Sequence, residues 1–208
     1  MGVRLLAVAD EINDALWGQA LDELRPDLIV ACGDLPFEYL ENLVSRTDKP
    51  LLYVPGNHDP DVHSVDGWHV MSPLAMPPGP AGCTNIDGRI EEAAGLRIAG
   101  LGGSIRYRPG PNQYTQRQMA LRALRLEIRV RLSGKPVDIL ITHSPPAGHG
   151  DSDDPPHRGF VALDRLARRL APRYLIHGHV TQYGPRKPAP QIGRTVIVNA
   201  IPSRLLEI

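Results

Sequence analysis

Short apolar runs alternate with segments of helical periodicity along the first third of the chain. The apolar runs are typical of buried strands, and the segments between them repeat their hydrophobic residues at helical spacing. In chain order, the pattern predicts a strand at Val3–Ala9, a helix at Ile12–Leu24, a strand at Leu28–Cys32, a helix at Phe37–Val44 and a strand at Leu51–Val54. This β-α-β-α-β order predicts an α/β fold whose parallel sheet is built with right-handed crossovers.

The rest of the chain continues with mixed elements. A Pro/Gly-rich loop is expected at Ser72–Gly82, strands at Arg89–Ala93, Leu96–Leu101, Val137–Thr142, Tyr174–Ile176 and Thr195–Val198, and a helix at Val161–Leu170. Thr115-x-x-Gln118 resembles a capping box that opens a further helix. Its expected apolar stripe consists of Leu121, Leu124, Ile128 and Leu132. Apolar residues also alternate with period two from Leu124 onward, which leaves a strand open there, although we favour the helix. Without a repeat or a linker, we expect one domain over residues 1–208.

The composition narrows the class of protein. The 208 residues are 42% hydrophobic and 22% charged, as in ordinary soluble domains, and 23 basic residues balance 23 acidic ones. A net charge of zero gives no sign of a broad nucleic-acid footprint. No apolar stretch approaches the ~20 residues that a membrane span needs, and the N-terminus lacks a secretory pattern, so we expect a cytoplasmic protein. The two cysteines make no disulfide framework, and Cys32 is expected in the core.

Polar side chains able to bind metal follow five of the predicted strands. In chain order they are Asp10, Asp34, Asn57 with His58 and Asp59, His143, and His177 with His179. Ligands of open α/β sheets bind outside the carboxyl ends of the strands, so these side chains are expected at one edge of the sheet. Their joint occurrence favours a site.

Each residue also has a simpler interpretation. Asp10 and Asp34 could cap the helices that follow them, and Gly56-Asn57 could be a turn. A lone histidine such as His143 is more often structural. His177 and His179 are harder to explain in this way, because alternate residues of an extended chain point in the same direction. Imidazole, carboxylate and amide ligands without thiolate suit Mn²⁺, Fe or Zn²⁺, and two such cations lie roughly 3.5–4 Å apart in two-metal sites.

The set of motifs resembles the calcineurin-like metallophosphoesterase superfamily, whose pattern is D-x-H, G-D-x-x, G-N-H-[DE], a lone His and G-H-x-H. The resemblance runs from Asp10 to His179 in the family's order. It implies a single-domain, four-layer αββα sandwich of two mixed β-sheets flanked by helices. It also implies a hydrolase of phosphomonoesters or phosphodiesters that uses a metal-bound, bridging hydroxide as its nucleophile and takes a small phosphoester as its substrate.

The resemblance assigns a role to each residue. Asp34 would bridge two divalent cations, for which Mn²⁺ is the first choice and Fe or Zn²⁺ are alternatives. The remaining ligands would be Asp10 and His179 at the first cation and Asn57, His143 and His177 at the second. His58 would be a catalytic residue near the scissile phosphate, and Asp59 would orient it through its other ring nitrogen.

One departure concerns the first cation. The family has D-x-H where this chain has Asp10-Glu11-Ile12, and isoleucine cannot be a ligand. We expect a weaker first site, unless a turn brings Glu11 or Asn13 inward. Ile176, in place of the glycine of the last motif, is expected to be harmless.

Other segments and functions carry less weight. The loop from Ser144 to Gly159, with two histidines and three aspartates, is either a substrate rim or a solvated acidic loop. Arg106-Tyr107-Arg108 could grip a phosphate, whereas Arg122, Arg125 and Arg129 are expected on a solvated helix face and His63 and His69 at the surface. Two alternative functions remain: a nuclease of the same superfamily, disfavoured by the neutral charge, and a non-catalytic protein-binding scaffold, favoured only by Ile12.

Overall fold

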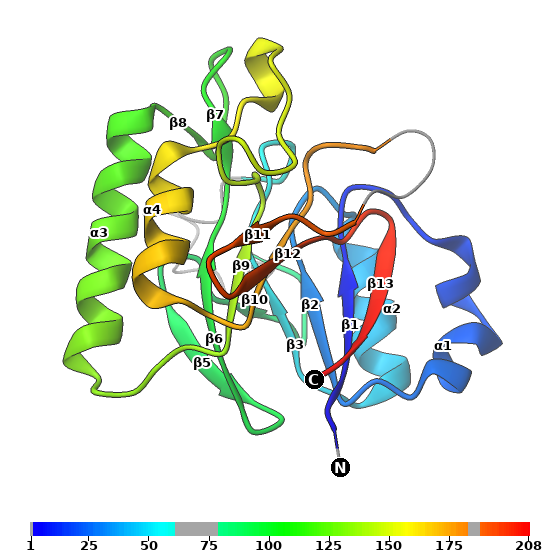
Figure 1. Ribbon diagram of the computed structural model, residues 1–208. Helices are drawn as coiled ribbons and strands as arrows, with labels where there is room; N and C mark the ends of the chain where they lie inside the picture. The colour runs from blue at the N-terminus through cyan, green and yellow to red at the C-terminus, as the bar shows by residue number, and fades with distance from the viewer. Residues whose placement is uncertain (1, 61–78, 183–187) are drawn as a thin grey trace, which may run out of the picture.

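Two mixed β-sheets lie face to face in the computed structural model, which describes residues 2–60, 79–182 and 188–208 (Figure 1). The first sheet has the order β13 (Ser203–Glu207), β1 (Arg4–Val8), β2 (Leu28–Ala31), β3 (Leu51–Tyr53) and β4 (Thr84–Asn85). The second has the order β11 (Gln191–Ile192), β12 (Thr195–Asn199), β10 (Tyr174–His177), β9 (Ile139–Thr142), β6 (Leu96–Leu101) and β5 (Ile90–Ala93). A short parallel pair, β7 (Ser104–Ile105) and β8 (Gln113–Tyr114), lies apart from them.

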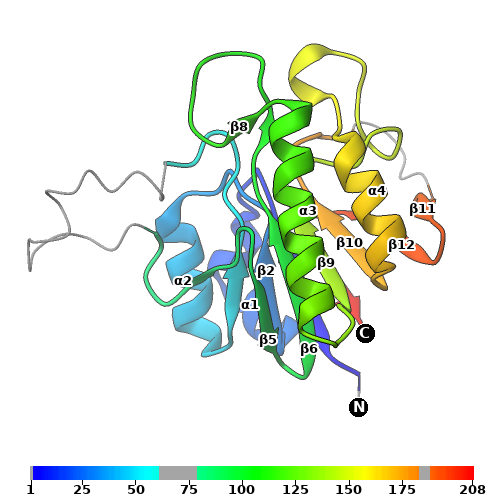
Figure 2. The same cartoon turned by 90° about the vertical axis from the view of Figure 1, so that its left-hand side faces the viewer.

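Helices cover the outer face of each sheet. The 3₁₀ turn η1 (Asp14–Trp17), α1 (Gln19–Leu24) and α2 (Phe37–Thr47) accompany the first sheet, and α3 (Gln116–Leu132) and α4 (Val161–Leu170) accompany the second. Figure 2 shows α3 and α4 side by side on this outer face. The four layers confirm the αββα architecture expected from the family resemblance.

Side-chain alternation explains why the strands are continuous apolar runs. In β1, Leu5 and Ala7 point into the core between the sheets, while Leu6 and Val8 pack with the helices on the other side. In β9, Ile139 faces the same central core and Leu140 faces α3 and α4. A strand with helices or a second sheet on both faces has no solvent side to mark with polar residues. Cys32 is fully buried in the central core, as expected.

Two expectations about helices are wrong. The segment Ile12–Leu24 is not one helix, because Gly18 has extended backbone angles and separates η1 from α1. In α3 the capping box at Thr115 is present, but the expected apolar stripe is not the buried one. Leu121, Leu124, Ile128 and Leu132 are 48%, 46%, 47% and 83% exposed, and the helix instead buries Met119, Ala123, Leu126, Glu127 and Val130.

A polar anchor fixes the rotation of α3. Arg122 pairs with the buried carboxylate of Asp87, donates to the Gly102 carbonyl and lies over the Tyr114 ring at 4.0 Å. The expectation that Arg122 lies on a solvated face is therefore wrong. Of the loop expected at Ser72–Gly82, residues 79–82 form a turn, and the rest, like His63 and His69, lies outside the described residues.

Candidate metal centre and active site

The carboxyl ends of β1, β2, β3, β9 and β10 deliver the site. Asp10 follows β1, Asp34 follows β2, and His143 follows β9 directly. His177 is the last residue of β10 and His179 lies two residues beyond it. Parallel pairing of β1 with β2, of β2 with β3, and of β9 with β10 brings all these ends to the same edge of the two sheets.

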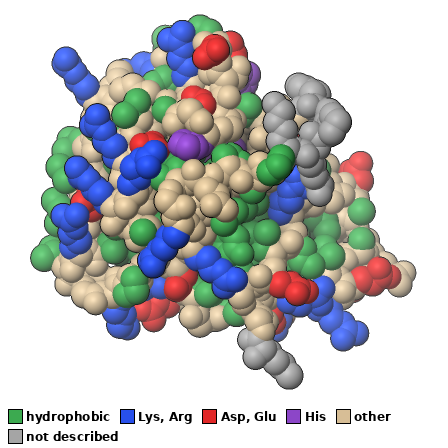
Figure 3. Space-filling model, viewed as in Figure 1, with side chains coloured by type: hydrophobic (Ala, Val, Ile, Leu, Met, Phe, Trp, Pro, Cys, Tyr) green, Lys and Arg blue, Asp and Glu red, His purple; other side chains and the backbone are tan. Residues whose placement is uncertain are grey.

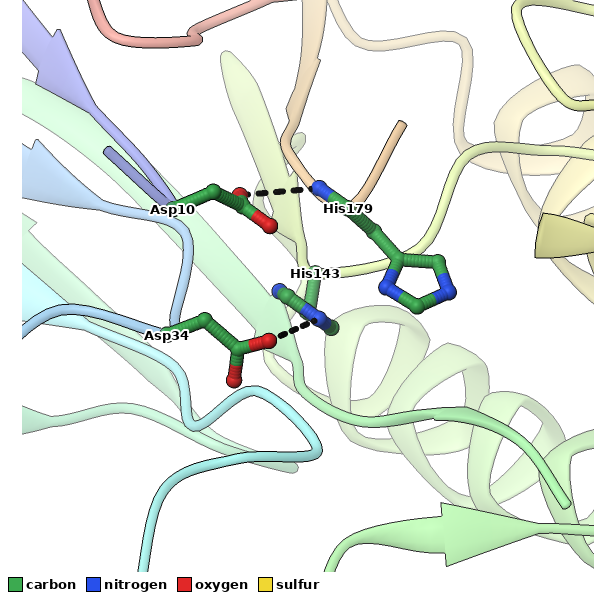
Figure 4. Close-up of side chains that lie close together, drawn as sticks. All are labelled: Asp10, Asp34, His143 and His179. Carbon is green, nitrogen blue, oxygen red and sulfur yellow. Dashed lines mark hydrogen bonds and ion pairs between the residues drawn. The ribbon is translucent and has the colours of Figure 1, made fainter. Parts of the chain in front are cut away.

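Four of the predicted ligands gather in one cluster. Asp10, Asp34, His143 and His179 each offer a ligand atom, and these atoms lie within 4.8 Å of one another. Figure 4 shows the two carboxylates facing the two imidazoles from neighbouring strand ends. Asp10, Asp34 and His179 have left-handed backbone angles, with φ of 59°, 58° and 68°. Such angles are costly for residues other than glycine and concentrate at functional sites.

His143 is held by the backbone on one side and faces two side-chain oxygens of the site on the other. Its Nδ1 is 2.7 Å from the Cys32 carbonyl, to which it donates, so Nε2 is the ring nitrogen that faces the site. That Nε2 lies 3.3 Å from Asp34 Oδ2 and 3.1 Å from Asn57 Oδ1. Once Nε2 has lost its proton, an imidazole nitrogen, a carboxylate oxygen and an amide oxygen face one point, which is the donor set a divalent cation requires.

Two glycines allow the carboxylates to approach so closely. A Cβ added at Gly56 would lie 2.0 Å from Asp34 Oδ1, and one at Gly178 would lie 2.2 Å from Asp10 Oδ2. Any side chain at these positions would displace a carboxylate. The glycines of the G-N-H-D and H-G-H segments therefore have a steric role in the site.

Burial and neighbouring charges shift the pKa values of the aspartates and histidines of the site. Burial raises the pKa of Asp10 to about 6. Burial opposes ionisation of Asp34 as well, but the adjacent His143 outweighs it and holds the pKa of that carboxyl below its usual range. Burial would lower the pKa of His143, yet the Asp34 and Asp10 carboxylates raise it to about 9. Burial lowers the pKa of His177 to about 4 and that of His179 to about 3, so both are neutral and able to ligate.

The remaining predicted site residues lie around this cluster. His177 is buried, with Nδ1 2.9 Å from the Gly178 carbonyl, and it does not belong to the group of four. The backbone amide of His58 donates to Asp34 Oδ1 at 2.8 Å. Asp59 Oδ2 accepts the amides of Asp34 and Gly56, at 2.9 and 2.7 Å. Among the described residues no contact joins the Asp59 carboxylate to the His58 ring, so Asp59 holds the loops of the site together instead.

A cavity of about 290 Å³ opens onto the cluster. It is lined by Asp10, Asp34, Asn57, His58, Tyr107, Pro156, His157 and His179. Two of the lining segments are ones whose role the sequence left open: Arg106–Arg108 supplies Tyr107, and the loop Ser144–Gly159 supplies Pro156 and His157. No local pattern distinguished these three residues from their neighbours in sequence. Arg106, which the sequence offered as one candidate for gripping a phosphate, donates to the Gln113 carbonyl.

Comparison with known proteins places the chain in a family. Residues 7–183 match the family model described as calcineurin-like phosphoesterase. A fold of two stacked mixed sheets with a cluster of aspartates and histidines at their strand ends agrees with that class. The chain belongs to the calcineurin-like phosphoesterase family.

Individual relatives are distant. UPF0046 protein C25E10.12 of Caenorhabditis elegans is 28% identical over 124 residues, which cover 57% of this chain and only 41% of that protein. One solved structure is 17% identical, with a TM-score of 0.69 over 100% of this chain and 95% of the other. The crystal structure of TT1561 of Thermus thermophilus is 17% identical, with a TM-score of 0.62 over 96% and 89%. These structural likenesses show the fold.

In the described part of the chain, no helix has the length and apolarity needed to cross a bilayer.

Proposed function

We propose that the protein is a metal-dependent hydrolase of small phosphoesters. The observation that carries this proposal is the convergence of Asp10, Asp34, His143 and His179, three of which line a cavity, with His143 buried beside them. The donor set fits a divalent cation, because one ring nitrogen of His143 is already bound to a carbonyl and the other faces two oxygens. Divalent cations held here, with Mn²⁺ as the first choice, would supply Lewis acidity and a nucleophilic water.

The residues of the chain have distinct tasks in this proposal. Asp34 would be shared by the two cations, as the family resemblance implies; its Oδ2 lies 3.3 Å from His143 Nε2, and its Oδ1 is positioned by the His58 amide. Asn57, His143 and His177 would hold the second cation. His58 lines the cavity without belonging to the cluster, so its side chain is available to the phosphoryl group of a substrate. The ring N–H of His58 can stabilise charge that develops on the phosphate.

Metal content and turnover of the purified protein test this proposal together. We expect about two cations per chain by elemental analysis, and Mn²⁺-dependent hydrolysis of p-nitrophenyl phosphate or bis-p-nitrophenyl phosphate. The faster substrate separates a monoesterase from a diesterase. Asn57→Ala and His143→Ala should each lose a cation and turnover, whereas His58→Ala should keep the cations and react more slowly. His149→Ala is the matched control, because His149 pairs with Asp164 at 3.4 Å and does not line the cavity.

A second candidate function is a protein-binding scaffold that retains the fold. The exposed stripe of Leu121, Leu124, Ile128 and Leu132 on α3 favours it, since adjacent exposed apolar side chains mark interaction surfaces. A scaffold predicts neither tight metal binding nor turnover. Absence of both, with Mn²⁺ in excess and the protein folded, would refute the hydrolase.

A further inference from the structure

The segment after β1 contributes only Asp10 to the first cation. Ile12, which stands where the family has a histidine, is 39% exposed and does not line the cavity. Glu11 accepts a hydrogen bond from the Thr181 hydroxyl. Asn13 accepts the Ala15 amide and donates to the Ser203 hydroxyl, so both ends of its side chain are used in the fold. Neither neighbour of Ile12 supplies the missing ligand.

A histidine from another part of the chain lines the cavity. His157 belongs to the 3₁₀ turn η3 (Pro155–His157), in the loop that follows β9. Its ring centroid is 5.2 Å from that of His179, with the rings inclined by 51°. The turn is attached to the site through Pro156, the residue before His157, because His179 Nε2 donates to the Pro156 carbonyl at 2.8 Å. In Figure 4, one ring nitrogen of His179 faces the cluster and the other points away from it.

The hydrogen bonding of His157 is that of a metal ligand. Its Nδ1 is 2.5 Å from Asp154 Oδ2, so this nitrogen donates and leaves the Nε2 lone pair available. Histidines that bind metals almost always donate their other ring N–H to a carboxylate or carbonyl. His143 and His179 follow the same rule with the carbonyls of Cys32 and Pro156. His149 also faces an aspartate, but it lies outside the cavity.

We propose that His157 is the imidazole ligand of the first cation in place of the histidine that is absent at position 12. The proposal rests on the metal site of the proposed function. His157 is outside the group of four whose ligand atoms lie within 4.8 Å, so its side chain must turn inward when the cation binds. Its side chain is 42% exposed, and residues 152–155 of the loop are exposed as well, so nothing packed in the core has to move. Asp154 is then a positioning residue.

Calorimetric titration of the metal-free protein with Mn²⁺, supported by elemental analysis, tests the proposal without relying on activity. His157→Ala should weaken one of two binding events by at least about tenfold and leave the other unchanged. Asp154→Asn should weaken the same event by about 10-fold, the lower end of the range for lost orienting partners. His149→Ala should bind like the wild type. Melting temperatures of all variants check that the loop substitutions leave the protein folded.

A rescue experiment distinguishes a ligand from a general disturbance of the loop. Adding Ile12→His to His157→Ala should restore the weakened event, because the histidine then returns at the position that the family uses. Unchanged affinity in His157→Ala would overturn the proposal, and so would an equal loss of both binding events, which would indicate a general disturbance of the loop. The proposed function fails on different grounds, namely a wild type that binds cations without turning over either phosphoester.

Discussion

Gly56→Ala is the most direct test of how tightly the site is assembled. The added Cβ would lie 2.0 Å from Asp34 Oδ1 and 2.7 Å from His143 Cε1. Ordinary contacts begin near 3.4 Å, so the Asp34 carboxylate has to retreat by more than about 1 Å. A displacement of about 1 Å can cost roughly 10²-fold in rate, and losing the hydrogen bond from the His58 amide costs about 1 kcal/mol.

We therefore expect Gly56→Ala to remain folded, with a free energy of unfolding lowered by about 1–3 kcal/mol, while Mn²⁺ binding weakens and turnover falls by about 10²-fold or more. Gly18→Ala is the matched control, since Gly18 also lacks a left-handed backbone and its nearest neighbour to a new Cβ is the Ala15 carbonyl oxygen at 3.9 Å. The assays are calorimetric Mn²⁺ titration, phosphoester hydrolysis and chemical denaturation. Wild-type affinity and turnover in Gly56→Ala would refute the steric reasoning.

Three further predictions concern protonation, packing and an ion pair. Cation binding near neutral pH should release about one proton, because the pKa of His143 is raised to about 9 in the metal-free site. The affinity for the cation should then rise with pH up to that value. Equal heats of binding in buffers of different ionisation enthalpy would contradict this prediction. Leu126→Ala should lower the free energy of unfolding by about 2–5 kcal/mol and Leu124→Ala by about 0.5 kcal/mol or less, since only the first is buried; equal losses in denaturation would reverse the assigned face of α3. Arg122→Ala should cost about 3 kcal/mol by leaving a buried carboxylate unpaired, whereas the exposed Arg125→Ala should be near neutral in the same assay.

The buried strands and the sheet edge that carries the candidate site could be predicted because both depend on local patterns. An apolar run such as β1 must be buried on both faces, and the polar residue that ends it must lie at the edge of the sheet. This rule made Asp10, Asp34 and His143 candidates, and their joint occurrence with the other strand-end residues favoured a site over a capping or structural role for each. The division of ligands between two cations came from the family resemblance, and it stays a prediction.

The face of α3 could not be predicted, because its sequence offers two apolar stripes. One runs through Met119, Leu126 and Val130, and the other through Leu121 and Ile128, and both have helical spacing. Hydrophobic periodicity does not distinguish them. The choice depends on a contact distant in sequence, the pairing of Arg122 with Asp87.

The contribution of Pro156 and His157 to the cavity could not be predicted from the sequence either. The loop from Ser144 to Gly159 has several residues able to bind metal, and its path decides which of them reaches the site. Asp151 accepts the amides of Gly148 and Gly159, which closes the loop on itself. That closure carries Pro156 and His157 over the strand ends and leaves His149 outside.

The exposed stripe of α3 and the metal cluster are compatible with each other. The cluster lies at the strand ends, whereas the stripe lies on the outer side of a helix that covers the second sheet. Arginine and lysine side chains gather on the side of the molecule where α3 and α4 lie (Figure 3). A partner bound there would not cover the cavity, so binding of a protein at α3 would not by itself argue against hydrolysis. Only the metal and turnover measurements separate the enzyme from the scaffold, because only they report on the strand ends.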